Sequence, residues 1–236
     1  YANNTVTIVN GSEFVNNTAK SGGAVTSALG NITVNDTEFV NNTATSGNGG
    51  ALNSVTDEVF VNNTKFDNNN ATNGLGGAIY GKTNVTAINT TFTNNTAGTA
   101  GGAIFSDTGI VNTSNSHFIN NTATTAGGAI YSNNNIIVNV TEFTNNTANT
   151  GGAIYSDTGK VLADNVSFVN NTAVSQGGAV YANSTVNLTN SNFTNNKVNG
   201  TSGTAGGAVF SNDQVMADNI KFINNTAING LGGAIY

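Results

Sequence analysis

Apolar and polar residues alternate along short stretches of this chain, and the same pattern returns every 25 to 29 residues. Each period has two apolar positions, then a phenylalanine, Asn-Asn, and Gly-Gly-Ala followed by an aliphatic residue. The phenylalanines are Phe14, Phe39, Phe66, Phe92, Phe118, Phe143, Phe168, Phe193 and Phe222. A period of this length along a whole chain is the signature of a solenoid, in which each repeat buries its apolar face against its neighbours.

Three short β-type stretches are expected in each repeat. Around Phe143 they cover residues 136–138, 141–144 and 153–155, with the turn formers Asn, Gly, Ser and Asp between them. No helical apolar period persists. The pattern predicts an all-β chain, a right-handed parallel β-helix (solenoid) with three strands per rung and about nine rungs of about 25–26 residues, each about 4.8 Å above the last. We expect residues 1–236 to form a single β-helix repeat domain, an uncapped segment of a longer protein whose signal, caps and flanking anchor domain lie outside it.

Alternation by two also predicts which side chains point inward. The residues seven and five positions before each phenylalanine are nearly all apolar, and they begin with Thr7 and Val9. We expect them to line the interior beside a buried stack of Phe39, Phe66, Phe92, Phe118, Phe143, Phe168 and Phe193. The repeat after Phe193 is the long one, and we expect its extra residues, within 198–204, to bulge from the rod as a loop.

The Asn-Asn and Gly-Gly pairs are expected at corners of the rung. Asparagine tolerates the left-handed backbone of a sharp corner, and stacked amides can hydrogen-bond along the rod. This assigns a structural role to asparagines such as Asn95, Asn121, Asn146 and Asn171. The glycines allow either a positive φ or a close backbone approach.

Composition excludes several classes of function. Cysteine is absent, so there is no disulfide framework or thiolate metal site. A net charge of −6 from 8 % charged residues is not the basic footprint of a nucleic-acid-binding protein. No apolar run is long enough to span a membrane. We expect no cofactor and no metal, because the nonapeptide calcium-roll pattern is missing and His117 is the only histidine.

Acidic residues are the candidates for catalysis, because parallel β-helices also carry polysaccharide lyases and hydrolases. Asp164 and Asp218 share one column two rungs apart, and Asp107 and Asp157 share another. Two rungs are about 9.6 Å, which is at or beyond the upper limit for an inverting carboxylate pair. The chain also has no arginine for an anionic sugar. We therefore expect no enzyme, with a carbohydrate-active β-helix enzyme as the alternative.

An aromatic column is the candidate binding surface. An aromatic residue follows the aliphatic residue after Gly-Gly-Ala in seven repeats: Tyr80, Phe105, Tyr131, Tyr155, Tyr181, Phe210 and Tyr236. If the aliphatic residue points inward, the aromatic one points outward. The column is then either a platform for a sugar or a protein, or a self-stacking column that stiffens the rod or is covered by a loop. Thr26 and Asn53 occupy the same position in the first two repeats.

The repeated F-x-x-N paired with G-G-A-[ILV] resembles the repeats of chlamydial polymorphic membrane proteins. The sequence N-N-T-A followed by G-G-A-I-Y resembles adhesin-like surface proteins of methanogenic archaea. The resemblance covers essentially the whole chain and implies secretion, a place at the cell surface, and binding to host cells, other microbes or glycans. It implies no catalytic residues.

These observations predict a non-enzymatic, adhesin-like stalk or binding segment whose partner is a cell-surface protein or glycan of another cell. Nucleic acid is not expected as a partner, and this segment should not span a membrane. N-x-[ST] sequons, for example at Asn16, Asn120 and Asn170, make the chain a candidate glycoprotein. An ice- or mineral-binding face is a weaker hypothesis, because the corner threonines form one column without a second flat column beside it.

Overall fold

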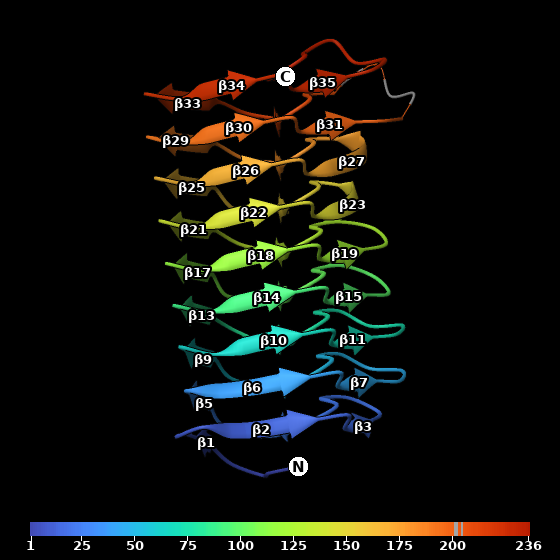
Figure 1. The fold of residues 1–236 in the computed structure, drawn as a ribbon, viewed down its shortest axis with the longest axis vertical. Helices are drawn as coiled ribbons and strands as arrows, with labels where there is room; N and C mark the ends of the chain where they lie inside the picture. The colour runs from blue at the N-terminus through green and yellow to red at the C-terminus, as the bar shows by residue number, and fades with distance from the viewer. Residues whose placement is uncertain (201–202, 204) are drawn as a thin grey trace.

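The computed structural model describes residues 1–200, 203 and 205–236. The chain coils into a straight rod of stacked rungs, with the N-terminus at one end and the C-terminus at the other (Figure 1). Its path rises as it passes from the left across the front to the right, which is a right-handed coil (Figure 1). The described part of the chain contains strands and no helix, and therefore no helix that could cross a membrane. The predicted parallel β-helix is confirmed.

Four parallel sheets run along the rod, and we name each after its first strand. The β1 sheet contains β1 (Val6–Ile8), β5 (Ile32–Asn35), β9 (Val59–Asn62), β13 (Val85–Ile88), β17 (Val111–Ser114), β21 (Ile136–Asn139), β25 (Val161–Asp164), β29 (Val186–Thr189) and β33 (Val215–Asp218). The β2 sheet, at the front in Figure 1, contains β2 (Ser12–Val15), β6 (Thr37–Val40), β10 (Lys65–Asp67), β14 (Thr91–Thr93), β18 (His117–Ile119), β22 (Glu142–Thr144), β26 (Ser167–Val169), β30 (Asn192–Thr194) and β34 (Lys221–Ile223).

The two other sheets complete each rung. The β3 sheet contains β3 (Thr18–Ala19), β7 (Thr43–Ala44), β11 (Asn70–Ala71), β15 (Thr96–Ala97), β19 (Thr122–Ala123), β23 (Thr147–Thr150), β27 (Thr172–Gln176), β31 (Lys197–Val198) and β35 (Thr226–Ala227). The β4 sheet contains β4 (Val25–Ser27), β8 (Leu52–Ser54), β12 (Ile79–Gly81), β16 (Ile104–Ser106), β20 (Ile130–Ser132), β24 (Ile154–Ser156), β28 (Val180–Ala182) and β32 (Val209–Ser211). The three predicted stretches are the strands of the β1, β2 and β4 sheets. The short strands of the β3 sheet, most of them Thr-Ala, are a fourth element of the rung.

The interior is a continuous apolar column. The seven phenylalanines from Phe39 to Phe193 are fully buried, and successive rings from Phe14 to Phe222 stack with centroids 4.6–5.0 Å apart. Inward residues of the β1 and β4 sheets, such as Val111 and Ile130, pack against the same column. Each strand pairs in parallel with its equivalent in the next rung. Phe118 therefore lies in register with Phe92 in the rung before it and with Phe143 in the rung after it.

The first rung departs from the expected alternation. Val6 and Ile8, not Thr7 and Val9, align with the inward residues Ile32 and Val34. Thr7 and Val9 are exposed, so their predicted inward position is wrong. The cause is one additional residue at the following corner, where both Asn10 and Gly11 adopt positive φ.

The two asparagines of each corner have different roles. The first, for example Asn120, adopts a positive φ near 55° and is exposed. The second, for example Asn121, is fully buried. Its side-chain Nδ2 donates to the carbonyl oxygen of Phe92 and to Oδ1 of Asn146, both at 3.0 Å. Its Oδ1 accepts from the backbone N–H and Nδ2 of Asn95. Every donor of this buried amide is therefore satisfied.

The two glycines of each Gly-Gly pair also differ. Gly101 has φ +67°, a conformation that L side chains rarely adopt. Gly102 has no such constraint, but a Cβ there would overlap the carbonyl oxygen of Gly128 in the next rung. Both expected reasons for glycine thus apply, one to each residue. The loop expected within 198–204 lies partly outside the described residues.

We expect Phe118→Ala to lower the free energy of unfolding by about 3–5 kcal/mol, because it removes a fully buried ring and its stacking on two neighbours. Repeats couple mainly to their neighbours, so the thermal melt should also separate into two transitions. Calorimetry measures both effects. The control Ile119→Thr changes the outward neighbour to the residue found at Thr93 and Thr144 and should stay roughly within 0.5 kcal/mol of the wild type. An unshifted, single transition for Phe118→Ala would contradict the stack.

We expect Val140→Asn to raise the free energy of unfolding by about 1–2 kcal/mol. Val140 has φ +46°, a conformation that crowds a β-branched side chain, whereas asparagine occupies the equivalent corners at Asn115 and Asn165. Chemical denaturation measures the difference. The reverse change, Asn115→Val, should lower stability by a similar amount. If Val140→Asn is destabilising, the Val140 side chain makes a contribution to the fold that outweighs its backbone strain.

Candidate functional site

The aromatic column lies on the outer face of the β4 sheet. Its rings, from Tyr80 to Tyr236, stack with centroids 4.7–5.7 Å apart and planes within 9° of parallel. Their neighbours Ile79, Ile104 and Ile130 belong to the interior core, while Tyr80 and Phe105 belong to a separate cluster. The column therefore points away from the interior, as alternation predicts.

The column is not the open platform that one of the two sequence hypotheses describes. Tyr80, Phe105, Tyr181 and Phe210 are each less than a tenth exposed, and Tyr131 and Tyr155 are half-buried. Tyr236, in the last rung, is 42 % exposed. Each ring covers the face of the next, and Leu75 and Ala100 pack against the cluster from the segment before the β4 sheet. Between successive rings, the faces are therefore already occupied by the column's own stacking.

A row of exposed and partly exposed polar side chains runs along the hydroxyl edge of the column. We call it the polar row, and it consists of Lys82, Asp107, Asn133, Asp157, Asn183 and Asn212. The hydroxyl of Tyr181 lies 2.8 Å from Oδ1 of Asn183 and accepts from Nδ2 of Asn212 at 3.1 Å.

Further contacts extend the polar row along the rod. The Tyr80 hydroxyl donates to Asp107 at 3.3 Å, and the Tyr155 hydroxyl donates to Asp157 at 3.4 Å. Lys82 forms an ion pair with Asp107. Asn133 donates to Asp107, and Asn183 donates to Asp157. The row is therefore a line of alternating donors and acceptors held in place by its own contacts and by the rigid column beneath it.

Burial raises the pKa of the column's tyrosines. The pKa of Tyr80 rises to about 12, first because burial disfavours the phenolate and then because of the Asp107 carboxylate. The pKa of Tyr131 also rises to about 12, through burial and then Asp157. The pKa values of Tyr155 and Tyr181 are raised as well, with burial again the main cause. These hydroxyls remain neutral at physiological pH, so they can both donate and accept hydrogen bonds.

The acidic pairs considered for catalysis do not meet. Asp164 and Asp218 lie in one column of the β1 sheet with Thr189 between them. Asn133 separates Asp107 from Asp157 in the polar row and binds the first of them. Among the described residues, no three His, Asp or Glu side chains come together in a way that could hold a metal ion.

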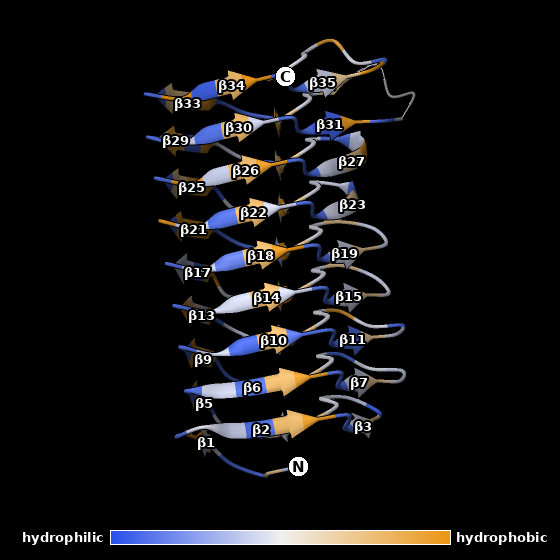
Figure 2. Ribbon diagram, in the orientation of Figure 1, coloured by the Kyte–Doolittle hydropathy of each residue, from blue (hydrophilic) through white to orange (hydrophobic). Residues whose placement is uncertain are grey.

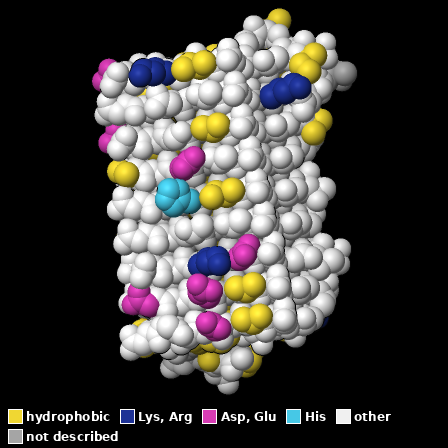
Figure 3. Space-filling view, in the orientation of Figure 1, with side chains coloured by type: hydrophobic (Ala, Val, Ile, Leu, Met, Phe, Trp, Pro, Cys, Tyr) yellow, Lys and Arg dark blue, Asp and Glu magenta, His cyan; other side chains and the backbone are white. Residues whose placement is uncertain are grey.

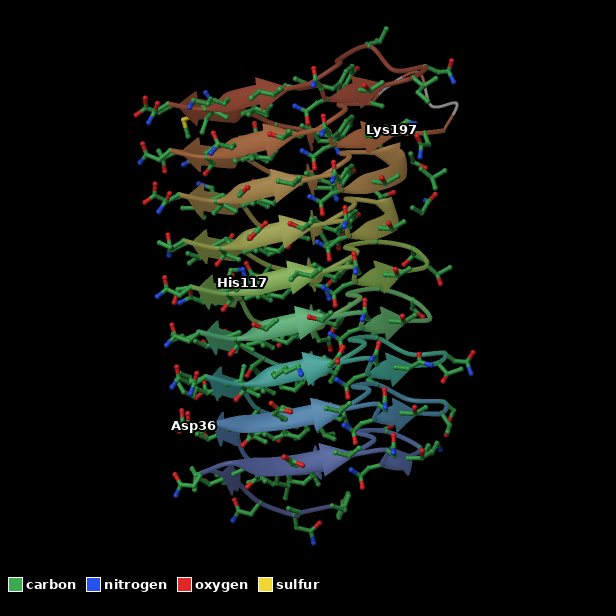
Figure 4. All side chains as sticks on the ribbon, in the orientation of Figure 1. Asp36, His117 and Lys197 are labelled. Atoms are coloured by element: carbon green, nitrogen blue, oxygen red, sulfur yellow. The ribbon has the colours of Figure 1, made fainter. Side chains whose placement is uncertain are left out.

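His117 lies on β18, in the middle of the front face (Figures 3 and 4). Its Nδ1 is 3.5 Å from Oε2 of Glu142, and its side chain is 53 % exposed. The carboxylates on this face gather mainly over the lower rungs (Figure 3). His117 and Glu142 form an exposed pair, without a third group that would make a site.

The sequon asparagines lie at the exposed corners. Asn16, Asn120 and Asn170 are the first residues of their pairs, whereas the buried amide ladder is made by the second residues, such as Asn121 and Asn171. The ladder therefore does not remove these sequons from solvent.

Sequence reasoning missed the polar row and an apolar surface on the β1 sheet. Asp107 and Asp157 were considered only as an acidic pair, and the hydroxyl contacts depend on where the aromatic side chains end. The apolar surface did leave a signal, because Ile137, Leu162 and Met216 stand where Thr86 and Asn112 stand in other rungs.

We expect the folded chain to lose stability as the pH rises from 10 to about 12. An unfolded chain releases its tyrosine protons near the ordinary pKa of 10, whereas the folded column keeps them to about 12 at Tyr80 and Tyr131. The stabilisation is complete below pH 10 and is lost as the pH passes through the folded pKa values. Denaturation at several pH values, with tyrosinate absorbance, measures the effect.

The control for this titration is Tyr131→Phe/Tyr155→Phe. Phenylalanine fits the column at Phe105 and Phe210, so the stack should persist and the decline with pH should become shallower. Ionisation of all the column's tyrosines near pH 10 in an intact fold would show that their hydroxyls are not protected.

A comparison of the sequence with known protein families identifies a repeated sequence unit. Six segments of the chain, residues 59–82, 89–107, 115–133, 140–157, 165–183 and 219–236, match the model of the Chlamydia polymorphic membrane protein repeat. The comparisons with curated proteins and with solved structures gave no match. The matched segments begin at or near a strand of the β1 sheet or the corner after it, and most run on through the β4 sheet. These six segments of the β-helix are thus similar to the repeats of the chlamydial polymorphic membrane proteins.

Proposed function

We propose that this chain is a non-enzymatic, adhesin-like segment of a secreted surface protein, and that it attaches to glycans of another cell through the polar row. Similarity to the chlamydial repeats supports a place at the cell surface. The Asn- and Thr-rich sequence, with its resemblance to adhesin-like proteins of methanogens, supports the same role. The observation that carries the binding proposal is the row of carboxylates and amides on the β4 sheet, which contacts the hydroxyls of Tyr80, Tyr155 and Tyr181.

The chemistry of the polar row suits carbohydrate hydroxyl groups. Asp157 and Asn183 offer side-chain oxygens as acceptors, and Asn183 and Asn212 offer amide donors. Asn183 and Asn212 are also exposed. The stacked rings beneath fix the positions of the hydroxyls, so little conformational entropy remains to be lost on binding.

The repetition of the row favours a long ligand. Equivalent groups recur once per rung, about 4.8 Å apart, which gives many similar weak contacts. Such contacts add up along a glycan chain more effectively than on a small molecule. Because the contacts are hydrogen bonds and Lys82 is already paired with Asp107, we expect binding to depend little on salt.

The test is a glycan-array and cell-attachment comparison of the wild type with Asn183→Ala/Asn212→Ala. We expect affinity for the bound glycan to fall at least tenfold, which corresponds to about 1.4 kcal/mol, because two exposed amides of the row are lost. A second variant, Tyr131→Phe/Tyr155→Phe/Tyr181→Phe, removes only hydroxyls and keeps the stack. Threonine at these positions, as at Thr26, would remove buried ring area and confuse folding with binding.

The control variant is Asn192→Ala on the outer face of the β2 sheet, which should bind as the wild type does. If both polar-row variants fold and bind unchanged, the row is not the site. Binding to a cell-surface protein that survives removal of all glycans would replace the glycan by a protein partner. Release of new reducing or unsaturated ends from pectin, alginate or mannan would contradict the non-enzymatic role.

A further inference from the structure

The outer face of the β1 sheet changes character along the rod. One outward column runs through all nine rungs, and its residues in register are Thr7, Thr33, Phe60, Thr86, Asn112, Ile137, Leu162, Asn187 and Met216. In the rungs of β21 to β33, three of the four residues are large and aliphatic or thioether side chains. Met216 is 43 % exposed, and Ile137 and Leu162 are partly exposed.

These side chains form a shallow groove of about 460 Å³. We call it the apolar groove. Ile137, Leu162 and Met216 line it, and Asp164 and Asp218 stand on its neighbouring column. The interior does not require apolar residues at these outward positions, because Thr86 and Asn112 occupy them in other rungs of the same fold.

The corner beside the groove also has an exposed apolar residue where the other rungs have a polar one. Val140 follows β21 directly and is 52 % exposed at φ +46°. The corners of the other rungs carry asparagine or aspartate, and the chain after β21 is orange in Figure 2 where the neighbouring corners are blue. An exposed, strained valine is unfavourable for folding, so its presence in the rung of Ile137 points to a role in contact with another molecule.

The charge of the groove restricts its occupant. No lysine lines the groove, and Asp164 and Asp218 make no ion pair among the described residues. The carboxylate of Asp164 accepts one hydrogen bond, from the side chain of Asn190. Asn187 also lines the groove, and its Oδ1 is buried without a hydrogen-bond partner. The groove therefore presents apolar surface beside unneutralised carboxylates, which complements an apolar segment that carries a positive charge.

We propose that the apolar groove docks a segment of a partner protein that presents apolar side chains next to a lysine or an arginine. β21, β25 and β29 are already hydrogen-bonded on both sides, so a partner contacts their side chains and adds no strand between them. An anionic lipid surface is repelled by the two aspartates. A second copy of this chain carries the same net charge of −6 and is also repelled.

Met216 provides a direct reporter, because it is the only methionine of the sequence. The experiment labels its methyl group with ¹³C and follows the resonance by NMR during titration with a synthetic peptide of alternating leucine and lysine. We expect a saturable shift of the Met216 methyl resonance. A peptide in which glutamate replaces lysine keeps the leucines and should give no shift.

Two groove variants test the location of binding. Ile137→Thr/Val140→Asn/Leu162→Thr introduces residues found at equivalent positions of other rungs and keeps Met216 as the reporter. We expect it to weaken the lysine peptide at least tenfold. Asp164→Asn/Asp218→Asn should also weaken binding tenfold or more and reduce its dependence on salt. The matched control is Val40→Thr/Ile119→Thr/Val169→Thr on the outer β2 sheet, which should bind as the wild type does.

Three outcomes would overturn the proposal. The first is equal affinity of the groove variant and the wild type for the lysine peptide. The second is equal affinity of the wild type for the lysine and glutamate peptides. The third is a shift of the Met216 resonance with protein concentration alone, together with a dimer in sedimentation, which would make a second copy the occupant. None of these outcomes bears on the polar row, which lies on a different sheet.

Discussion

The buried corner amide is the interaction on which the rod depends. In each of the inner rungs, the second asparagine of the corner donates from Nδ2 to a phenylalanine carbonyl of the rung before and to the amide oxygen of the rung after. Its backbone N–H donates to that same oxygen. A buried amide that lost these partners would be costly, so each asparagine requires another asparagine in register above it.

This requirement extends to the rest of the rung. With the corners in register, the phenylalanine that precedes them stacks on its equivalents, and the Gly-Gly pair brings the next backbone close enough to pack. The first asparagine and the first glycine turn the chain with positive φ, while the second of each pair serves the packing between rungs. Each two-residue motif therefore combines a turn with a vertical contact, which explains why both residues recur together.

The surface is under weaker constraint, because outward side chains meet only their neighbours and solvent. An outward residue that differs from its equivalents in other rungs and lowers stability therefore points to a role other than folding. The rings of the aromatic column stack on one another, and hydroxyl groups of its tyrosines form hydrogen bonds with the polar row. Ile137, Leu162 and Met216, with Val140 beside them, add nothing to the interior and expose apolar surface. The rigid rod thus presents two different faces, one polar and one apolar, on different sheets.

The sequence by itself determined the period, the phenylalanine stack, the corner asparagines and the parallel β-helix, because each of these rests on a local rule repeated nine times. Alternation also determined that Tyr131 and Tyr155 point away from the interior. It could not determine that their faces are covered, because that depends on the distance between rungs and on Leu75 and Ala100 folding over the cluster. Val6 and Ile8 point inward because the corner after them has one additional residue. This residue moves the inward positions of the first rung by one, although inward and outward residues still alternate. Only the tertiary structure decided which polar groups meet along the hydroxyl edge, and that the outward residues of β21 to β33 form one groove, because both result from side chains of separate rungs brought together by stacking.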